Sequence, residues 1–374
     1  MAIEIVKVTT KKQLKAFIFL PAKLHKNDKL WVPPVYMDEK IYFNPQKNKS
    51  FNYSDTILML AYKNGKVSGR IMGLINFRYN EIQKENNARF CYFEGYEDTE
   101  VATALLNSIE NWAKEKKMNR LIGPFGFSDK DPQGFLIEGY DQLPVIASNY
   151  NSTTAPAFME FSGYEKEVDL FVYKLVIPKE LPDFYKVIFD RITKNSGFSI
   201  KEYSKRKDLK KDIRPIFTLI NETFTDIYGF MPFEQKEMDD FASRYLAVIK
   251  PQYVKSILKD NQIIAFIIGM PDISLGVQKA KGYVFPYGFV HIFNAQKKTK
   301  RLSLLLGAIK SEYRGRGLDV LLGTKLIESA RTGGFEYIDS HLELENNTVM
   351  RSEMEKMGGV VYKKFRVFGK NLTP

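Results

Sequence analysis

The stretch that decides the fold is RLSLLLGAIKSEYRGRGLDVLL, residues Arg301–Leu322. A hydrophobic run from Leu302 to Ile309 predicts a strand. The glycines and arginines of 314–317 predict a turn, and the apolar pattern from Leu318 onward predicts a helix. Glycine lets the backbone approach a ligand closely, and the first N–H groups of a helix have no partner within it. With two arginines beside them, these groups suit a pyrophosphate. The alternative is an ordinary strand-to-helix connection with solvated arginines.

Residues 311–318, SEYRGRGL, resemble the acyl-CoA-binding signature of GCN5-related N-acetyltransferases (GNAT). That signature is Arg or Gln, two residues, Gly, one residue, and then Gly or Ala. Arg314 and Gly317 occupy its first two fixed positions, whereas Asp319 stands at the third. An aspartate suits the positive end of an empty helix dipole but repels a pyrophosphate. The resemblance therefore implies the GNAT fold more firmly than it implies ordinary acetyl-CoA binding.

The remaining sequence predicts one order of elements twice: strand, helix, hairpin, strand, helix, strand, helix and strand. In the first half, Asn64 and Gly65 lie between two apolar runs, which indicates a hairpin with a type I′ turn. Pro178–Pro182 is the predicted joint between the halves. This order is also the GNAT order. The predicted fold class is α+β, with two tandem GNAT-like domains at residues 1–177 and 178–374, each a mixed, mostly antiparallel sheet flanked by helices.

The first half lacks the basic turn of the second half. At the equivalent point between strand and helix it reads GYEDTE, residues 95–100, with three acids and no arginine. Such a turn would repel a pyrophosphate. We interpret the first half as a degenerate copy that has kept the fold and lost the cofactor.

The resemblance also implies which residues bind an acyl-CoA co-substrate. In GNAT enzymes the fourth and fifth strands splay apart, and the pantetheine arm lies between them. This assigns the arm to the end of the predicted fourth strand, at Leu306, Gly307, Ala308, Ile309 and Lys310. The turn and helix start that suit a pyrophosphate, which we call the cradle, add Arg314, Gly315, Arg316, Gly317, Leu318 and Asp319. Asn347, which opens the last predicted helix, completes the set.

GNAT chemistry is direct attack of an amine on a thioester, which needs a base for the ammonium and a donor for the oxyanion. The predicted fifth strand, 337–344, and the residue after it offer four titratable residues two apart: Asp339, His341, Glu343 and Glu345. Residues two apart on a strand share one face, which looks either into the cleft or to solvent. Glu345 and His341 are preferred as catalytic residues because they lie nearest the open end of the cleft.

The tyrosine that many GNAT enzymes place near the leaving thiolate is absent. Its positions, a few residues after Asn347, are Met350, Arg351 and Ser352. Tyr362 and Tyr313 are the alternative proton donors, and the competing interpretation is that both are packed, hydrogen-bonded tyrosines.

Composition limits the class of protein. The chain has 374 residues, a net charge of +12, one cysteine and three histidines, which exclude a disulfide framework and argue against a metal site. No apolar signal core opens the chain and no apolar run is long enough to span a membrane, so a cytoplasmic protein is the expectation. The charge favours acidic partners such as CoA, an acyl-carrier protein or anionic lipid, or else reflects a lysine-rich solvated surface. Nucleic acid is disfavoured because no recognition motif accompanies the charge.

Two further segments depart from a plain GNAT domain. Residues 27–54 form a long aromatic stretch that is either a lid or a cluster packed on the core. Residues 271–300 are an insertion with an apolar segment at 290–300 that ends in lysines. This segment predicts an amphipathic helix that lines a channel, touches a membrane surface or simply packs.

Three function classes follow. The first is an N-acyltransferase that moves an acetyl or longer acyl group from CoA to a primary amine of a small molecule or lipid. The second is a transferase that uses an acyl-carrier protein to make an amino-lipid. The third is a non-catalytic binding protein with the GNAT fold.

Overall fold

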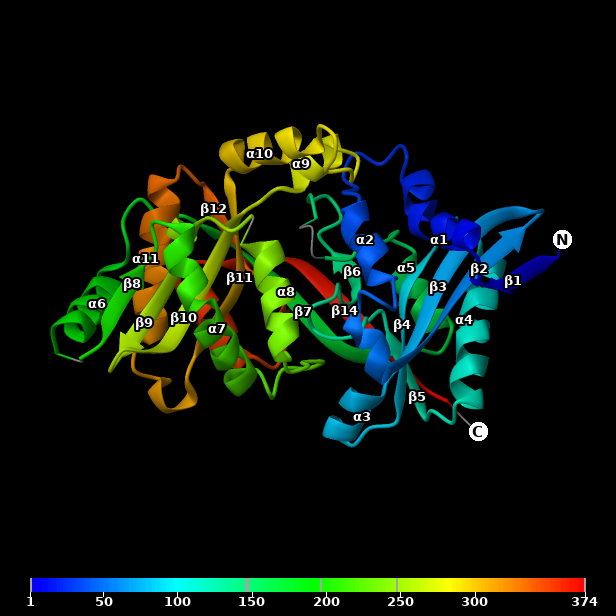
Figure 1. The fold of residues 1–374 in the computed structure, drawn as a ribbon, viewed down its shortest axis with the longest axis horizontal. Coiled ribbons are helices and arrows are strands. Elements are labelled where there is room, and N and C mark those ends of the chain that lie inside the picture. The colour runs from blue at the N-terminus through cyan, green and yellow to red at the C-terminus, as the bar shows by residue number, and fades with distance from the viewer. Residues whose placement is uncertain (1, 145–147, 196, 247, 373–374) are drawn as a thin grey trace. The chain divides into compact units, whose positions relative to one another are not determined.

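In the computed structural model, residues 2–144, 148–195, 197–246 and 248–372 are described. The chain divides into two compact units. Unit 1 contains residues 1–171, 273–294 and 363–374, and unit 2 contains residues 172–272 and 295–362. Figure 1 labels the helices and strands of the two units and colours the chain from the N-terminus to the C-terminus.

The sheet of unit 1 has the strand order β1-β2-β3-β4-β5-β14. Neighbouring strands are antiparallel except β4 and β5, which are parallel. The predicted hairpin is confirmed, since Asn64 and Gly65 have φ values of 55° and 71°, as a type I′ turn requires. The bounds are β1 (Ile3–Lys7), β2 (Ser54–Lys63), β3 (Lys66–Asn76), β4 (Asn87–Gly95), β5 (Arg120–Gly123) and β14 (Val360–Asn371).

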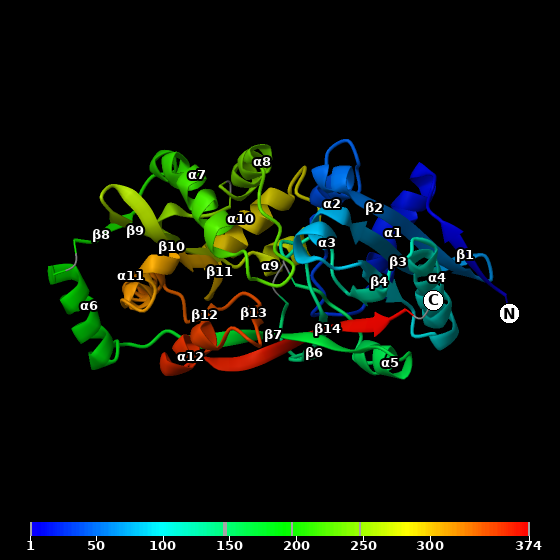
Figure 2. The ribbon, with the colours of Figure 1, turned by 90° about the horizontal axis from the view of Figure 1, so that it is seen from below.

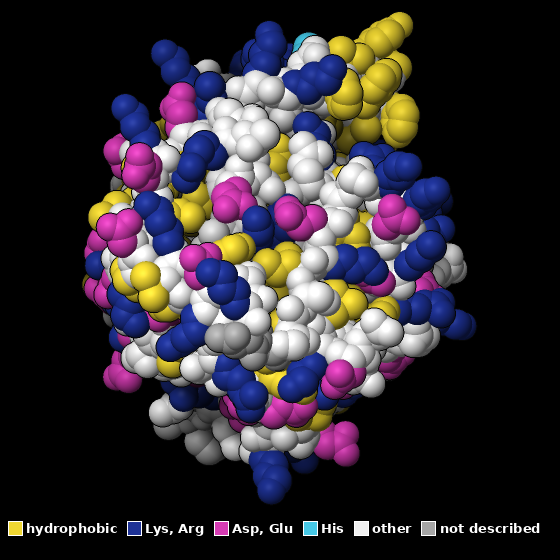
Figure 3. Space-filling model, turned by 90° about the vertical axis from the view of Figure 1, so that its left-hand side faces the viewer, with side chains coloured by type: hydrophobic (Ala, Val, Ile, Leu, Met, Phe, Trp, Pro, Cys, Tyr) yellow, Lys and Arg dark blue, Asp and Glu magenta, His cyan; other side chains and the backbone are white. Residues whose placement is uncertain are grey.

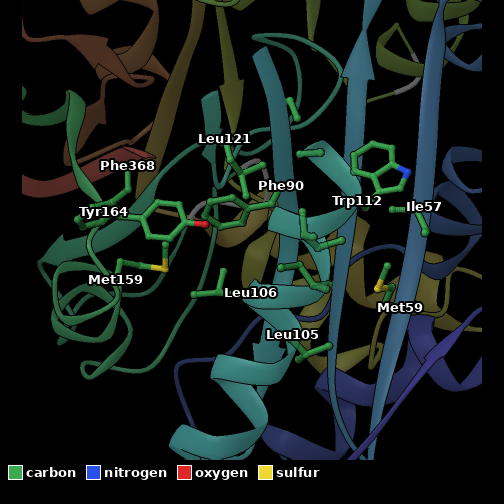
Figure 4. Close-up of a cluster of buried hydrophobic side chains, with 14 of the residues drawn as sticks. Ile57, Met59, Phe90, Leu105, Leu106, Trp112, Leu121, Met159, Tyr164 and Phe368 are labelled. Atoms are coloured by element: carbon green, nitrogen blue, oxygen red, sulfur yellow. The ribbon is translucent and has the colours of Figure 1, made fainter. Parts of the chain in front are cut away.

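Two apolar clusters cover opposite faces of this sheet. Along β3, Ile71 and Ile75 join the cluster beneath α4 (Thr99–Glu115). Met72 and Leu74 join the cluster beneath α1 (Lys11–Leu24), because alternate residues of a strand point to opposite faces. Figure 4 shows the first cluster, in which side chains of α4 lie against the strands.

The aromatic stretch 27–54 packs on unit 1. It contains α2 (Tyr36–Tyr42) and a 3₁₀ turn, η1 (Lys49–Tyr53). Tyr36 and Phe43 are buried beside Phe17 of α1, so the interpretation as a packed cluster is confirmed. Unit 1 also contains the short elements α3 (Phe77–Gln83), β6 (Phe135–Glu138) and α5 (Ala155–Phe161), of which α3 and β6 have no counterpart in the predicted order. Elements α3 and β6 are both too short to show a repeating pattern of apolar residues.

The sheet of unit 2 has the strand order β7-β12-β11-β10-β9-β8, and the short β13 (Glu343–Leu344) pairs with β7. Only β11 and β12 are parallel among these neighbours. The bounds are β7 (Glu165–Val176), β8 (Ser199–Glu202), β9 (Val254–Lys259), β10 (Gln262–Pro271), β11 (Arg301–Ile309) and β12 (Tyr337–Asp339).

Helices cover both faces of the unit 2 sheet, as Figure 2 shows. Phe266 and Ile268 of β10 pack with α7 (Arg206–Thr223) and α8 (Gln235–Tyr245). Ala265 packs with α11 (Leu318–Thr332) and α6 (Asp183–Asn195). Unit 2 also contains α12 (Thr348–Lys356) and the 3₁₀ turns η2 (Pro251–Tyr253) and η3 (Ser311–Tyr313).

The two sequence halves exchange their closing strands. β7 ends the first half, yet its last residues pair with β12 in unit 2. β14 ends the second half, yet its later residues pair with β5 and β6 in unit 1. The compact units therefore do not coincide with the halves 1–177 and 178–374, which remain a prediction about the repeated sequence.

The predicted insertion forms two helices, α9 (Ser274–Lys279) and α10 (Gly288–Lys298). The amphipathic helix expected at 290–300 thus begins two residues earlier. Within the described ranges, no helix combines the length and apolar character needed to cross a bilayer.

Candidate active site

The fourth and fifth strands of unit 2 separate, as the resemblance implies. β11 pairs with β12 only from Arg301 to Ser303, whereas its pairing with β10 continues to Ile309. A bulge leaves Leu305 between the pairs Ile268–Leu306 and Gly269–Leu304. The segment 306–310, predicted to bind the pantetheine arm, follows this bulge and lies beyond the last pair with β12. On the side that faces β12, the backbone N–H and C=O groups of this segment therefore lie on an open strand edge. Such an edge can form hydrogen bonds with the amide groups of an extended pantetheine arm.

The predicted cradle connects this edge to α11. Gly315 and Gly317 have φ values of 72° and 81°, in the left-handed region that favours glycine. Nothing lies within 4 Å of a Cβ built at Gly315. Arg314 and Arg316 are exposed; Arg314 Nε donates to the carbonyl of Ile309 at 3.2 Å, and the Arg316 guanidinium lies 5.3 Å from the Tyr313 ring centroid. Exposed arginines, open space and the start of a helix fit a diphosphate.

Gly317 has a second reason to be glycine. A Cβ there would lie 2.7 Å from Ile192 Cδ1 and 2.9 Å from Ile188 Cγ2, both on α6. The close packing of α6 on the start of α11 therefore requires this glycine in addition to any ligand.

Asp319 and Glu353 place negative charge near the cradle. Desolvation and the carboxylate of Glu353 raise the pKa of Asp319, whereas the backbone N–H groups at the helix start lower it. This acid pair opposes a diphosphate while the arginines favour one.

The four base candidates do not share one strand face, and that expectation is wrong. Regular strand ends at Asp339 and resumes only at Glu343. Asp339 is fully buried, 3.4 Å from Arg301, so its solvent-exposed interpretation is wrong as well. The Ser340 N–H donates to the carbonyl of Tyr173 at 2.8 Å, which extends the contact of β12 with β7 by one residue.

Glu343 has the pKa best suited to a base. Desolvation raises it to about 7, and a hydrogen bond donated by Asn347 Nδ2 at 3.4 Å opposes the rise. Desolvation lowers the pKa of His341 to about 4, so its imidazole is neutral at neutral pH. Glu345, preferred from the sequence, is half-buried, and its backbone carbonyl accepts from Arg351 at 2.8 Å. The sequence included Glu343 among the candidates but carried no sign of its desolvation.

Both tyrosine candidates are packed, Tyr362 through a hydrogen bond and Tyr313 through an edge-to-face ring contact. The Tyr362 hydroxyl donates to buried Asp339, and burial raises the pKa of Tyr362. Tyr313 packs edge-on against Phe198, with centroids 5.9 Å apart. Arg351, at a position where the family has its tyrosine, donates instead to the hydroxyl of Tyr173 at 3.0 Å. This arrangement fits the structural interpretation of Tyr362 and Tyr313.

In unit 1, the turn at residues 95–100 corresponds to the cradle, and its Asp98 side chain forms local interactions. Asp98 caps α4 by accepting from the Val101 N–H at 3.3 Å, and it also pairs with Lys63 at 2.6 Å. A carboxylate thus occupies the helix start that would receive a phosphate.

Unit 1 contains a polar cluster that the sequence did not reveal. Arg70 is buried; it donates to Glu94 at 3.0 Å and lies 5.0 Å from the Tyr92 ring centroid. The Tyr92 hydroxyl donates to Glu39 at 3.2 Å. Desolvation raises the pKa of Glu39 to about 7 and that of Asp131 to about 6. These side chains come from segments far apart in sequence, so no local pattern indicates them.

We also searched the described residues for side chains that could bind a metal ion. Among the described residues, no group of three or more His, Cys, Asp or Glu side chains is arranged to hold a metal ion.

The chain is similar to known proteins both in sequence and in structure. No family model matches the chain. It is 25% identical over 381 residues to the bacterial ceramide synthase of Caulobacter vibrioides, covering 99% of this chain and 98% of that protein. It is 26% identical to protein YghO of Escherichia coli, covering 97% and 94% of the two chains. A solved tandem GNAT protein from the clavulanic acid biosynthesis pathway aligns over 100% of this chain and 99% of its own, with 12% identity and a TM-score of 0.57. This chain therefore has the tandem fold of the GCN5-related N-acetyltransferases.

Proposed function

We propose that this protein is an N-acyltransferase that moves a long acyl chain from a thioester to the primary amine of a long-chain amino-lipid. The observation that carries the proposal is the open edge of β11 next to the cradle, in a unit that also holds a desolvated carboxylate, Glu343. Together they supply a place for a thioester arm and a base for an amine.

Each group has a defined task in this proposal. Arg314, Arg316 and the N–H groups at the start of α11 hold the diphosphate of a CoA donor, and residues 306–310 hold its arm. Glu343 accepts the proton of the ammonium, since a pKa of about 7 leaves it partly ionised at neutral pH. The free amine then attacks the thioester carbon, the C–N bond forms, the C–S bond breaks, and the thiolate leaves and takes up a proton.

The lipid acceptor is supported by the relative named bacterial ceramide synthase, which is similar over nearly the whole chain. A ceramide is the amide of a long-chain amino alcohol. A long acyl group is also consistent with the cluster beside the open edge, where Leu305, Leu306 and Ala308 contact apolar side chains.

A carrier-protein donor is the second candidate. The acids Asp319 and Glu353 oppose a CoA diphosphate, whereas a net charge of +12 attracts an acidic carrier protein. A cytoplasmic location, where both donors occur, remains part of the proposal.

The test is an assay of amide formation by mass spectrometry. The purified chain is incubated with a C18 amino alcohol and, in parallel, palmitoyl-CoA, palmitoyl-carrier protein or acetyl-CoA. We expect an N-palmitoyl product with at least one palmitoyl donor and little acetyl product. A Glu343→Gln variant should lose activity, and Glu336→Gln, whose side chain is exposed, is the matched control. Absence of product with every donor and several amines would favour a non-catalytic role.

A further inference from the structure

The inserted segment, of which residues 273–294 belong to unit 1, exposes several large apolar side chains. Tyr287 is 76% exposed and Phe285 is 69% exposed. Figure 3 shows hydrophobic side chains gathered at the top right of the view, with Lys and Arg side chains beside them. We call the exposed set the aromatic surface; it comprises Leu275, Tyr283, Phe285, Tyr287, Phe289, Val290 and Phe293.

The opposite side of the segment is fixed to unit 1. The Tyr36 N–H donates to the carbonyl of Gly282 at 3.0 Å, and Gln278 Nε2 donates to the carbonyls of Lys29 and Trp31 at 2.8 and 2.9 Å. Val277 is completely buried. The segment is therefore anchored through one side. Tyr283, which is half-exposed, also packs against buried Tyr36 with ring centroids 5.0 Å apart, whereas Phe285 and Tyr287 are mostly exposed.

The spacing within α10 joins apolar and basic side chains. Phe289, Phe293 and Lys297 are four residues apart, so they lie in one row along the helix. Val290 and Lys298 lie eight residues apart in the adjacent row. The row begins with exposed rings and ends with an exposed ammonium group, the pattern of a helix that lies at a lipid–water interface.

Residues 273–300 themselves carry charge of one sign. From Ile273 to Lys300 the sequence contains no acidic residue, and it contains five lysines: Lys279, Lys281, Lys297, Lys298 and Lys300. All five are exposed, and Lys300 lies 3.6 Å from the carboxylate of Glu336. An anionic surface would complement them, whereas an apolar patch evolved for packing against a second protein usually has fewer charges at its centre.

We propose that the aromatic surface and its lysines bind an anionic phospholipid bilayer, with the rings entering the headgroup region and the lysines contacting lipid phosphates. The proposal does not depend on the proposed function, because it concerns binding in the absence of any acyl donor or acceptor.

The experiment measures partitioning of the full chain onto sedimented vesicles of pure phosphatidylcholine or of phosphatidylcholine with one-quarter phosphatidylglycerol. We expect binding to the anionic vesicles that is roughly tenfold stronger than to the neutral ones and that weakens with salt. Phe285→Ser with Phe289→Ser should reduce it roughly tenfold. Replacing Lys279, Lys281, Lys297 and Lys298 by Gln should remove the preference for anionic vesicles.

The matched control is Phe77→Ser with Phe161→Ser. These two rings are 53% and 84% exposed but lie on α3 and α5, outside the aromatic surface, so binding should be unchanged. Equal loss in both double variants, or no binding of the original chain to either vesicle, would overturn the proposal. A concentration-dependent dimer that the Phe285→Ser and Phe289→Ser changes abolish, without vesicle binding, would assign the surface to self-association instead.

Discussion

Asn347 links the start of α12 to the candidate base Glu343. Its side-chain oxygen accepts from the Met350 N–H, and its amide nitrogen donates to the Glu343 carboxylate, both at 3.4 Å. The residue that the family resemblance assigns to cofactor binding is thus also a helix cap and a partner of the base. This relationship connects the stability of α12 with the ionisation of Glu343.

We predict that activity rises with pH through a value near 7 because Glu343 must be ionised to accept a proton. Glu343→Gln should lower kcat by about 100-fold or more and flatten this limb of the profile. The Glu345→Gln variant should retain the rise of activity with pH near 7. A flat profile with Glu345→Gln alone would instead identify Glu345 as the base, as the sequence suggested.

Asn347→Ala should move the rise of activity to higher pH, because the hydrogen bond from Asn347 lowers the pKa of Glu343. Loss of the cap should also reduce the free energy of unfolding by about 1 kcal/mol. Rate profiles and thermal unfolding measure the two effects. Asn346→Ala, at an exposed position next to the cap, is the control and should change neither.

Arg314→Ala with Arg316→Ala should weaken CoA binding by more than roughly tenfold, because hydrogen bonds to charged groups contribute about 1.5–3 kcal/mol each. Titration calorimetry measures this, with Arg331→Ala in the last turn of α11 as the control. Asp319→Ala should tighten binding by removing a negative charge. An unchanged dissociation constant in the double arginine variant would remove the cradle assignment.

Gly317→Ala and Gly315→Ala separate backbone strain from packing. Both glycines have positive φ, so each substitution should cost about 1 kcal/mol or more. Only the Gly317 variant also places a Cβ against Ile188 and Ile192, so it should be clearly the less stable of the two in denaturant unfolding. Equal losses would show that α6 moves aside without cost.

Glu39 should make unit 1 less stable as pH rises. Its folded-state pKa is raised from 4.5 to about 7, so the folded state holds the proton more tightly than the unfolded state. The free energy of unfolding should therefore fall between pH 4.5 and about 7, with no further change from this group above that window. Glu39→Gln should reduce the slope, measured by urea unfolding at several pH values. An unaltered slope would mean that Glu39 titrates normally.

Local sequence patterns determined most elements of the fold. The Asn64–Gly65 turn and the Gly-rich start of α11 were both predictable, because turn chemistry depends on a few neighbouring residues. The splay of β11 and β12 was implied by the family resemblance and is present.

Tertiary structure alone decided the environments of the candidate residues. Asp339, His341 and Glu343 look equivalent in the alternating sequence. In the fold, Asp339 pairs with buried Arg301, His341 is desolvated, and Glu343 acquires the pKa of a base. The exchange of β7 and β14 was equally invisible, since strand pairing joins segments more than a hundred residues apart. Periodicity fixes which faces of an element are apolar, but the partner that covers each face depends on the packing of the whole chain.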